Sequence, residues 1–302
     1  MKKLVLVFIA VACMSMSTQA KILRVNNVSG MAPYQTIRAA VDAAQEGDTI
    51  MVDGSSVNYP NDTISKRIAL IGPGYFLREN DIGVETVVPA RINGLVIDAE
   101  GCTVAGMDIH DGKLWINAPK TIITRCKITG WTGVEFTKGA DGCVFHQNYI
   151  TCGIGGNVAH PDNTYNHQFT NNIMIMKFTA IHNSYIAYNT SGHDTEVLNQ
   201  FFSAGNIVER NMTEVYEGTA DGNTYRDNYK VNRFYYSTDK QVLEKLSDVP
   251  DEVMAQYGAF AGDDPYVISG IPAGPVIERL TVPVSVEEGS KLNVTIKLGL
   301  QK

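Results

Sequence analysis

The sequence predicts an all-β solenoid, a single-stranded parallel β-helix with an N-terminal capping α-helix and a β-rich C-terminal tail. Three observations predict this fold. A seven-residue pattern recurs along the middle of the chain, the same residue types share its columns, and short strand-like segments are separated by turn residues. The 302 residues, of which 44% are hydrophobic, are enough to bury a substantial core in one elongated domain.

The recurring pattern reads glycine or asparagine, two variable residues, an apolar residue, two more variable residues, and asparagine. Clear copies lie at 142–148, 166–172, 183–189, 205–211 and 222–228, and weaker ones at 101–107 and 120–126. A repeat of about 20 residues is typical of solenoids, in which each unit stacks on the one before it. We therefore expect like positions of successive copies to lie one above the other.

Each column of the pattern has a physical reason in such a coil. Gly and Asn in the first position suit sharp corners that need positive φ. The apolar column points inward and packs on its own copies: Val104, Ile123, Phe145, Phe169, Ile186, Val208 and Tyr225. An amide both donates and accepts, so the final column is expected to form a hydrogen-bonded ladder: Asn148, Asn172, Asn189, Asn211 and Asn228. The alternative fold, a β-sandwich with Asn-rich loops, gives no reason for these columns.

The N-terminus has the features of an export signal. Lys2 and Lys3 precede an apolar run at 4–13, and small and polar residues follow as far as Ala20. This order predicts a signal peptide at 1–20, cleaved after Ala20, and a secreted or periplasmic protein. A lipoprotein acylated at Cys13 is the alternative, although the aliphatic residue usual three positions before such a cysteine is an alanine here. No other stretch is apolar for long enough to span a membrane.

The elements that follow are read from periodicity. Segment 36–46 has apolar residues at helical spacing and is expected to end at Gly47, with strands before it from Ile22 and after it at 49–52 and 67–75. The coil with its cap is expected over 21–236, with the repeats at 91–236. The tail, 237–302, begins with a helical pattern and carries two alternating strands. We expect it to pack along the coil and close its second end, or to pair as a hairpin; a separate adhesive module is the alternative.

Residues 34–74 resemble the N-terminal capping segment of secreted right-handed parallel β-helix proteins of bacterial type, the pectin-lyase-like superfamily. The resemblance is carried by TIRAAVDAAQEGDTIMV at 36–52 and ISKRIALIGPG at 64–74. The repeats at 91–236 resemble the generic repeat of that superfamily. The resemblance implies a right-handed coil whose open end is covered by a helix, and acidic or neutral polysaccharide as the substrate class.

Charge and cysteine usage exclude several other functions. The net charge is −7 and no basic block occurs, so nucleic acid is not an expected partner. Cys102, Cys126, Cys143 and Cys152 form no CxxC pair, which argues against zinc, and we expect buried free thiols. No metal or cofactor is expected; Ca²⁺ serves polysaccharide lyases, but no motif here supports it. We expect a monomer.

Catalytic motifs of the superfamily's known branches are absent. The polygalacturonase-like branch has Asn-Thr-Asp, Asp-Asp, Gly-His-Gly and Arg-Ile-Lys, and only Ser191-Gly192-His193-Asp194 approaches any of these. The Arg-x-Pro-x-x-Arg of pectate lyases is also missing. Glycoside hydrolysis and lyase elimination both need a carboxylate or base at the scissile bond, and the remaining candidates are Glu135, His193 and Asp194. Whether the chain is an enzyme stays open at this point.

A sugar-binding surface is the clearest functional feature. Trp115 and Glu135 fall at the outward position of one strand column, one turn apart, and Asn157 is expected to continue that column. An aromatic ring beside carboxylates and amides suits a sugar. Loop 159–165 adds His160 next to a carboxylate, although loop histidines are usually only solvated, and Trp115 could instead pack under a loop. The sequence thus predicts a protein that binds or processes polysaccharide; the alternative is a non-catalytic cell-surface or scaffold protein.

Overall fold

A computed structural model describes most of the chain from Ala20 onward. The described residues are 20–77, 88–130, 133–156, 164–176, 178–191, 198, 203–213, 218–220, 222–231, 249–281, 291 and 294–301. The predicted signal peptide, apart from Ala20, and Cys13 lie outside them.

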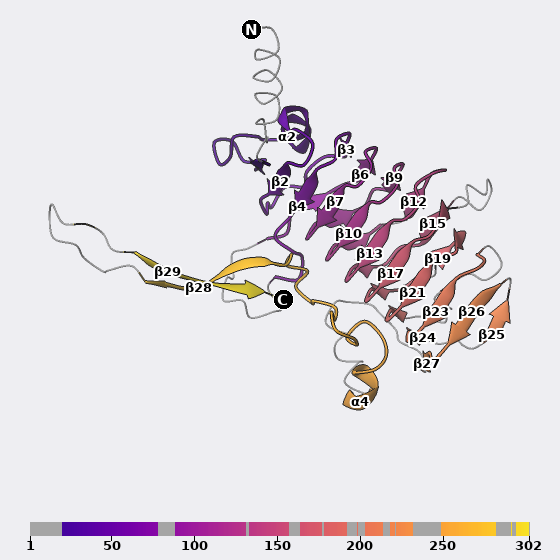
Figure 1. The fold of residues 1–302 in the computed structure, drawn as a ribbon. Helices are drawn as coiled ribbons and strands as arrows, with labels where there is room; N and C mark the ends of the chain where they lie inside the picture. The colour runs from indigo at the N-terminus through magenta and orange to yellow at the C-terminus, as the bar shows by residue number, and fades with distance from the viewer. Residues whose placement is uncertain are drawn as a thin grey trace, which may run out of the picture.

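The chain winds through three parallel sheets, passing from sheet A to sheet B to sheet C in each full turn (Figure 1). Sheet A consists of β1 (Ile22–Val25), β2 (Thr49–Val52), β4 (Ala69–Ile71), β7 (Thr103–Ala105), β10 (Ile122–Thr124), β13 (Val144–His146), β17 (Gln168–Thr170), β21 (Tyr185–Ala187), β23 (Ile207–Glu209), β26 (Asn223–Arg226) and β25 (Gly218–Ala220). Sheet B consists of β5 (Arg91–Ile92), β8 (Asp108–His110), β11 (Lys127–Thr129), β14 (Tyr149–Ile150), β18 (Ile173–Met174), β22 (Thr190–Ser191), β24 (Met212–Thr213) and β27 (Tyr229–Lys230).

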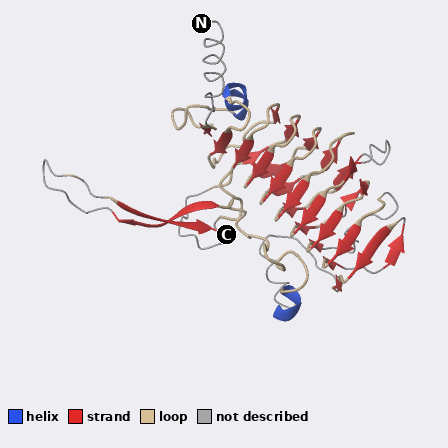
Figure 2. Ribbon diagram, viewed as in Figure 1, coloured by secondary structure: helices blue, strands red, loops and turns tan. Residues whose placement is uncertain are grey.

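Sheet C completes the turn. It consists of β3 (Asp62–Ile64), β6 (Leu95–Ile97), β9 (Leu114–Ile116), β12 (Val134–Phe136), β15 (Ile154–Gly156) and β19 (Phe178–Thr179). A further parallel pair joins β16 (Thr164–Tyr165) to β20 (Ile181–His182), and only β25 runs antiparallel to its neighbour within the coil as described. This is the predicted single-stranded parallel β-helix, and Figure 2 shows its strands as one continuous stack.

The pairing register confirms that like positions of the repeat lie directly over one another. In sheet A each member of the predicted apolar column pairs with the next: Val104 with Ile123, then Phe145, Phe169, Ile186, Val208 and Tyr225. The column also extends upstream through Leu70, Ile50 and Leu23, where the sequence repeat is not recognisable. Most of these side chains are fully buried, so each turn buries its apolar residue against copies above and below.

The asparagine column forms the predicted ladder. The Oδ1 of Asn172 accepts from both the backbone N and the Nδ2 of Asn148, at 2.9 and 3.0 Å. Asn189, Asn211 and Asn228 repeat the same pair of bonds one turn further on each time, at 2.9–3.0 Å. Each amide Nδ2 also donates to a backbone carbonyl of the previous turn. The ladder therefore satisfies a whole column of buried polar groups.

A second polar column lies at position two of the repeat, and the sequence does not predict it. There the backbone N of Cys143 donates to His167 Nδ1, the N of His167 to Ser184 Oγ, and the N of Ser184 to Asn206 Oδ1. Asn206 then bonds Asn223 as in the main ladder, at 3.0 and 2.8 Å. In successive turns, different side chains thus accept a hydrogen bond from the equivalent backbone N–H at this corner.

The corners themselves have the conformation that the first column predicts. Gly142, Asn166, Asn183, Gly205 and Gly222 all have φ between 48° and 75°. A second left-handed corner, at position six, is occupied by other residue types: Arg125, Gln147, Asn171, Tyr188, Arg210 and Asp227. In the repeat region, each sheet A strand from β7 to β23, and β26, is therefore flanked by two left-handed residues. Gly and Asn, which adopt this conformation most readily, recur at the first corner, whereas the second corner holds varied residue types.

The N-terminal end is covered by helix α2 (Ile37–Ala43), as predicted. Thr36 caps the helix by accepting from the backbone N of Ala39 at 3.1 Å. Ile37, Ala40 and Val41 are buried against β1, β2 and β3. The helix ends four residues before Gly47, which has φ 88° and turns the chain into β2.

The described part of the tail packs along the coil, as the first expected arrangement has it, and closure of the second end stays a prediction. After helix α4 (Asp251–Met254) it runs back past successive turns toward the N-terminal end. Residues at the left-handed sixth position hold its backbone carbonyls: Asn171 donates to Ala259 and Ala261, and Gln147 to Pro265. Arg125 continues the series to Ile271 at 2.9 Å. The helical pattern expected from residue 237 lies outside the described residues as far as 248.

The tail ends in a hairpin of β28 (Gly274–Thr281) and β29 (Thr295–Gln301). Antiparallel pairing is the second expected arrangement, so the tail both packs along the coil and forms a hairpin. In Figure 1 the hairpin leaves the coil near its N-terminal turns and projects away from it.

Loss of the side-chain bonds from Asn171 is expected to loosen the tail without unfolding the coil. Asn171→Gly keeps the left-handed corner, which glycine adopts freely, but removes both bonds to the tail carbonyls. We expect limited proteolysis near 255–265 to accelerate about five- to tenfold, equivalent to about 1 kcal/mol. Asn166→Gly, at an exposed corner away from these bonds, is the control. Equal cleavage of both variants and the unmodified protein would show that the tail is held by other contacts.

Candidate functional site

The outer face of sheet C brings the two main sequence candidates together. The register pairs Glu135 with Trp115 on one side and with Gly155 on the other, and the column continues to Val96 and Thr179. Trp115 is half-buried, and its neighbours Leu114 and Ile116 point into the core. The prediction that Trp115 and Glu135 are outward-facing neighbours one turn apart is confirmed.

Lys113, which precedes β9, joins this pair into a cluster. Its Nζ lies 2.6 Å from Glu135 Oε1 and 4.6 Å from the centroid of the Trp115 ring. An ammonium over an indole face is a favourable cation–π contact, and the ion pair fixes the lysine between ring and carboxylate. The side chains of Lys113 and Glu135 remain 32% and 27% exposed. The cluster thus presents an aromatic ring, a donor and an acceptor to solvent. The part played by Lys113 is not predictable from the repeat pattern.

Apart from Trp115 and Glu135, the residues predicted for catalysis or sugar binding fall in segments that the structure does not describe. Gly155, not Asn157, lies beside Glu135 in the column. Two glycines in β15 conceal the alternation of side chains there, so the sequence does not show which residue faces outward. Asn157 itself lies outside the described residues, as do His160, His193 and Asp194.

A second polar cluster lies on the outer face of sheet A, near the C-terminal turns. Tyr185 donates to Glu209 Oε1 at 2.8 Å, and Arg226 Nε donates to Oε2 at 2.5 Å. Burial and the bond to Glu209 raise the pKa of Tyr185 to about 12. Burial alone would raise the pKa of Glu209, but the bonds from Arg226 and Tyr185 outweigh it and lower that pKa. The carboxylate stays ionised and fully engaged, which suits a structural role.

His146 connects sheet A to the tail. Its Nδ1 lies 2.8 Å from Thr170 Oγ1, and its Nε2 lies 3.0 Å from Asp264 Oδ2. A hydroxyl, an imidazole and a carboxylate in sequence can relay a proton. However, His110 and Thr129 form the same cross-turn pair in sheet B at 2.9 Å. The pairing therefore follows from the stacking of His over Thr, and Asp264 serves to anchor the tail.

The four cysteines that the structure describes have no arrangement suited to redox or metal chemistry. Cys102, Cys126, Cys143 and Cys152 are all free and buried, as predicted. Burial raises the pKa of Cys126 and Cys152 to about 12 and that of Cys143 to about 11, which keeps them as thiols. Within the described ranges no group of three or more His, Cys, Asp or Glu side chains is placed to hold a metal ion.

Among the helices that the structure describes, none combines the length and the apolar character needed to cross a bilayer. No protein-family model, no curated protein and no solved structure matches this chain.

Proposed function

We propose that the protein binds polysaccharide along the outer face of sheet C, with the Lys113–Trp115–Glu135 cluster as the main contact. The observation that carries this proposal is the half-buried Trp115 ring on a regular outward column, flanked by a donor and an acceptor. A sugar ring offers an apolar face to an indole and hydroxyls to polar groups at its rim. Lys113 lies over the indole of Trp115 in the free protein. A sugar stacked on the indole would displace the lysine ammonium to the edge of the ring, where it can donate to the sugar hydroxyls.

The geometry of the column favours a chain-like ligand. Successive parallel strands lie about 4.8 Å apart, so Val96, Trp115, Glu135, Gly155 and Thr179 form a row along the coil axis. The row is shallow beside Glu135 because Gly155 has no side chain. A Cβ at this position would lie 1.9 Å from the Thr179 backbone oxygen, so a larger residue does not fit. An extended ligand lying along the axis contacts several turns at once, which adds affinity without requiring a deep pocket.

We propose binding without cleavage. Hydrolysis of a glycosidic bond needs two carboxyl groups, one of them protonated, on opposite sides of the bond. Glu135 is held by the Lys113 ammonium, and no second carboxylate contacts this cluster among the described residues.

The proposal is tested by affinity electrophoresis against a panel of soluble plant and host polysaccharides. We expect at least one to retard the protein, and Trp115→Ala to weaken that binding by about tenfold or more. Tyr185→Ala, which removes a half-buried aromatic ring from sheet A, should leave it unchanged. Reducing-end and unsaturated-product assays should stay negative.

Two results would contradict the proposal: no polysaccharide in the panel retards the protein, or Trp115→Ala binds as tightly as the unmodified chain. Loss of binding in Tyr185→Ala alone would move the contact to sheet A. A non-catalytic scaffold protein is the second candidate, favoured by the hairpin β28–β29, whose strands pair with each other and project from the coil. In that case the coil serves as a spacer, and no glycan in the panel is bound.

A further inference from the structure

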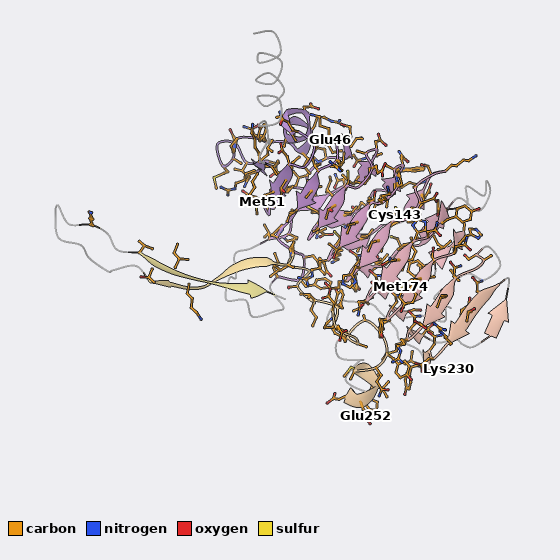
Figure 3. The ribbon with its side chains drawn as sticks, in the orientation of Figure 1. Glu46, Met51, Cys143, Met174, Lys230 and Glu252 are labelled. Carbon is orange, nitrogen blue, oxygen red and sulfur yellow. The ribbon has the colours of Figure 1, made fainter. Side chains whose placement is uncertain are left out.

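A cavity of about 370 Å³ lies on sheet A at the N-terminal turns, on a different sheet from the proposed glycan surface. One wall is polar and is formed by Arg24, Asn26 and Asp53; another is apolar and includes Met51 and Ile71. Figure 3 labels Met51 at this end of the coil. Neither the repeat nor the proposed function explains these residues.

The hydrogen bonds of the polar wall leave donors, not acceptors, for a ligand. Arg24 Nε lies 3.0 and 2.9 Å from the two Asp53 oxygens, and its Nη2 lies 2.7 Å from Oδ2. Asn26, itself nearly buried, adds a third donor to Oδ2 at 2.9 Å. Both carboxylate oxygens are therefore engaged. The Nη1 of Arg24 has no partner within the described part of the chain, and Arg24 is 57% exposed.

Asp53 acts as the positioning group for this guanidinium. Burial by itself would raise the pKa of Asp53, but the bonds from Arg24 and Asn26 outweigh it and lower that pKa. The carboxylate thus stays charged and holds one edge of the planar fork. The opposite edge is left to face a ligand, in the geometry that recognises a carboxylate.

The other walls are apolar and closely fitted. Arg24, Met51 and Ile71 are successive neighbours in one outward column of sheet A, and Met51 is 45% exposed. Val88 closes over Gly54 so tightly that a Cβ there would lie 1.8 Å from the Val88 oxygen. Among the residues that the structure describes, no aromatic ring lines the cavity, so it offers no surface for stacking a neutral sugar.

We propose that this cavity binds a small monocarboxylate with a compact apolar body. The carboxylate accepts from Nη1 of Arg24, and the body packs on Met51 and Ile71. This chemistry fits an apolar amino acid or a peptide carboxyl terminus; a sugar acid shares the carboxylate but carries hydroxyl groups in place of the apolar body. Because Asp53 already offsets the charge of Arg24, we expect weak affinity, with a Kd on the order of 1 mM.

The test uses the whole protein and three probes in isothermal titration calorimetry and chemical-shift titration. N-acetyl-leucine has the carboxylate and an apolar body, N-acetyl-leucinamide replaces the charge with an amide, and methyl glucuronide represents a sugar acid. We expect one of the two acids to bind at least about tenfold more tightly than the amide, and the better acid identifies the source. Arg24→Gln should abolish this difference. Arg67→Gln, which removes an exposed guanidinium 3.8 Å from Glu46, should preserve it.

The result that overturns the proposal is equal binding of acids and amide by the unmodified protein, which includes no detectable binding of either up to about 10 mM. Unchanged acid binding in Arg24→Gln would also overturn it. If Arg24→Gln proves unstable, the comparison of acid with amide on the unmodified protein still decides. Trp115→Ala should bind the acids normally, so failure of the glycan surface and failure of this cavity are distinguishable.

Discussion

Replacing Asn189 with Leu is expected to destabilise the protein by about 3–5 kcal/mol, because the loss spreads to two neighbouring turns. Asn189 is fully buried. Its Oδ1 accepts from the backbone N and Nδ2 of Asn172, and its Nδ2 donates to Phe169 O. A leucine of similar size fills the space but leaves these groups without partners. Each buried polar group left unpaired costs about 1–3 kcal/mol.

Asn228→Leu is the matched control at the end of the same ladder. Asn228 makes the corresponding bonds to Asn211 and Val208, but it is half-buried, so water can replace part of what is lost. We expect a destabilisation of about 1–2 kcal/mol. Denaturant unfolding at constant m-value measures both variants. A ladder that stabilises the fold is contradicted if Asn189→Leu unfolds at the same midpoint as the unmodified protein.

The second large effect is a loss of stability on acidification, caused by His167. This side chain is 1% exposed and lies among Phe136 and Phe169, with ring centroids 4.7 and 5.8 Å away. Its Nδ1 accepts from Cys143 N, so the neutral ring carries its proton on Nε2. Burial lowers the pKa of His167 to about 4, against a small opposing effect of Asp141.

The direction of the pH dependence follows from this lowered pKa. The unfolded chain binds a proton near pH 6.5, whereas the folded chain resists it down to about pH 4. The stabilisation is therefore complete above about pH 6.5 and is lost as the pH falls toward 4. Between about pH 7.5 and pH 5 the expected loss is about 2 kcal/mol.

Chemical denaturation at several pH values measures this slope, and two variants isolate its source. His167→Asn should lack that part of the slope, whatever its absolute stability, because it has no group to titrate. His110→Gln, on the outer side of sheet B, should retain it. If the slope survives in His167→Asn, the acid sensitivity originates in other groups.

The sequence predicts those features that depend on one residue type repeating in one place. Phe145 and Phe169, or Asn172 and Asn189, are recognisable because only an apolar side chain or an amide serves at those positions. The second ladder is not recognisable in the sequence, because an imidazole, a hydroxyl and an amide accept the equivalent backbone N–H in successive turns: His167, Ser184 and Asn206. A column that is defined only by the position of a backbone N–H does not repeat one residue type, so it cannot be recognised in the sequence.

The path of the tail was unpredictable in detail for a related reason. Arg125, Gln147 and Asn171 read as ordinary solvent-facing polar residues, and they bind the tail through its backbone carbonyls, which every residue has. Of the sheet C cluster, the alternation around Trp115 and Glu135 was readable. Lys113 was not, because it lies outside the strand and reaches its partners through a long side chain.

The most direct test of stacked like-on-like columns is the contact network of the asparagine side chains. Selective ¹⁵N-Asn labelling with an ¹⁵N-edited NOESY experiment resolves each side-chain amide. The structure predicts cross-peaks from Asn172 Nδ2 protons to Asn148 and Asn189, and from Asn189 to Asn211, with slow solvent exchange for all four. Rapidly exchanging, unconnected amide signals would place these asparagines in separate loops and contradict the coil.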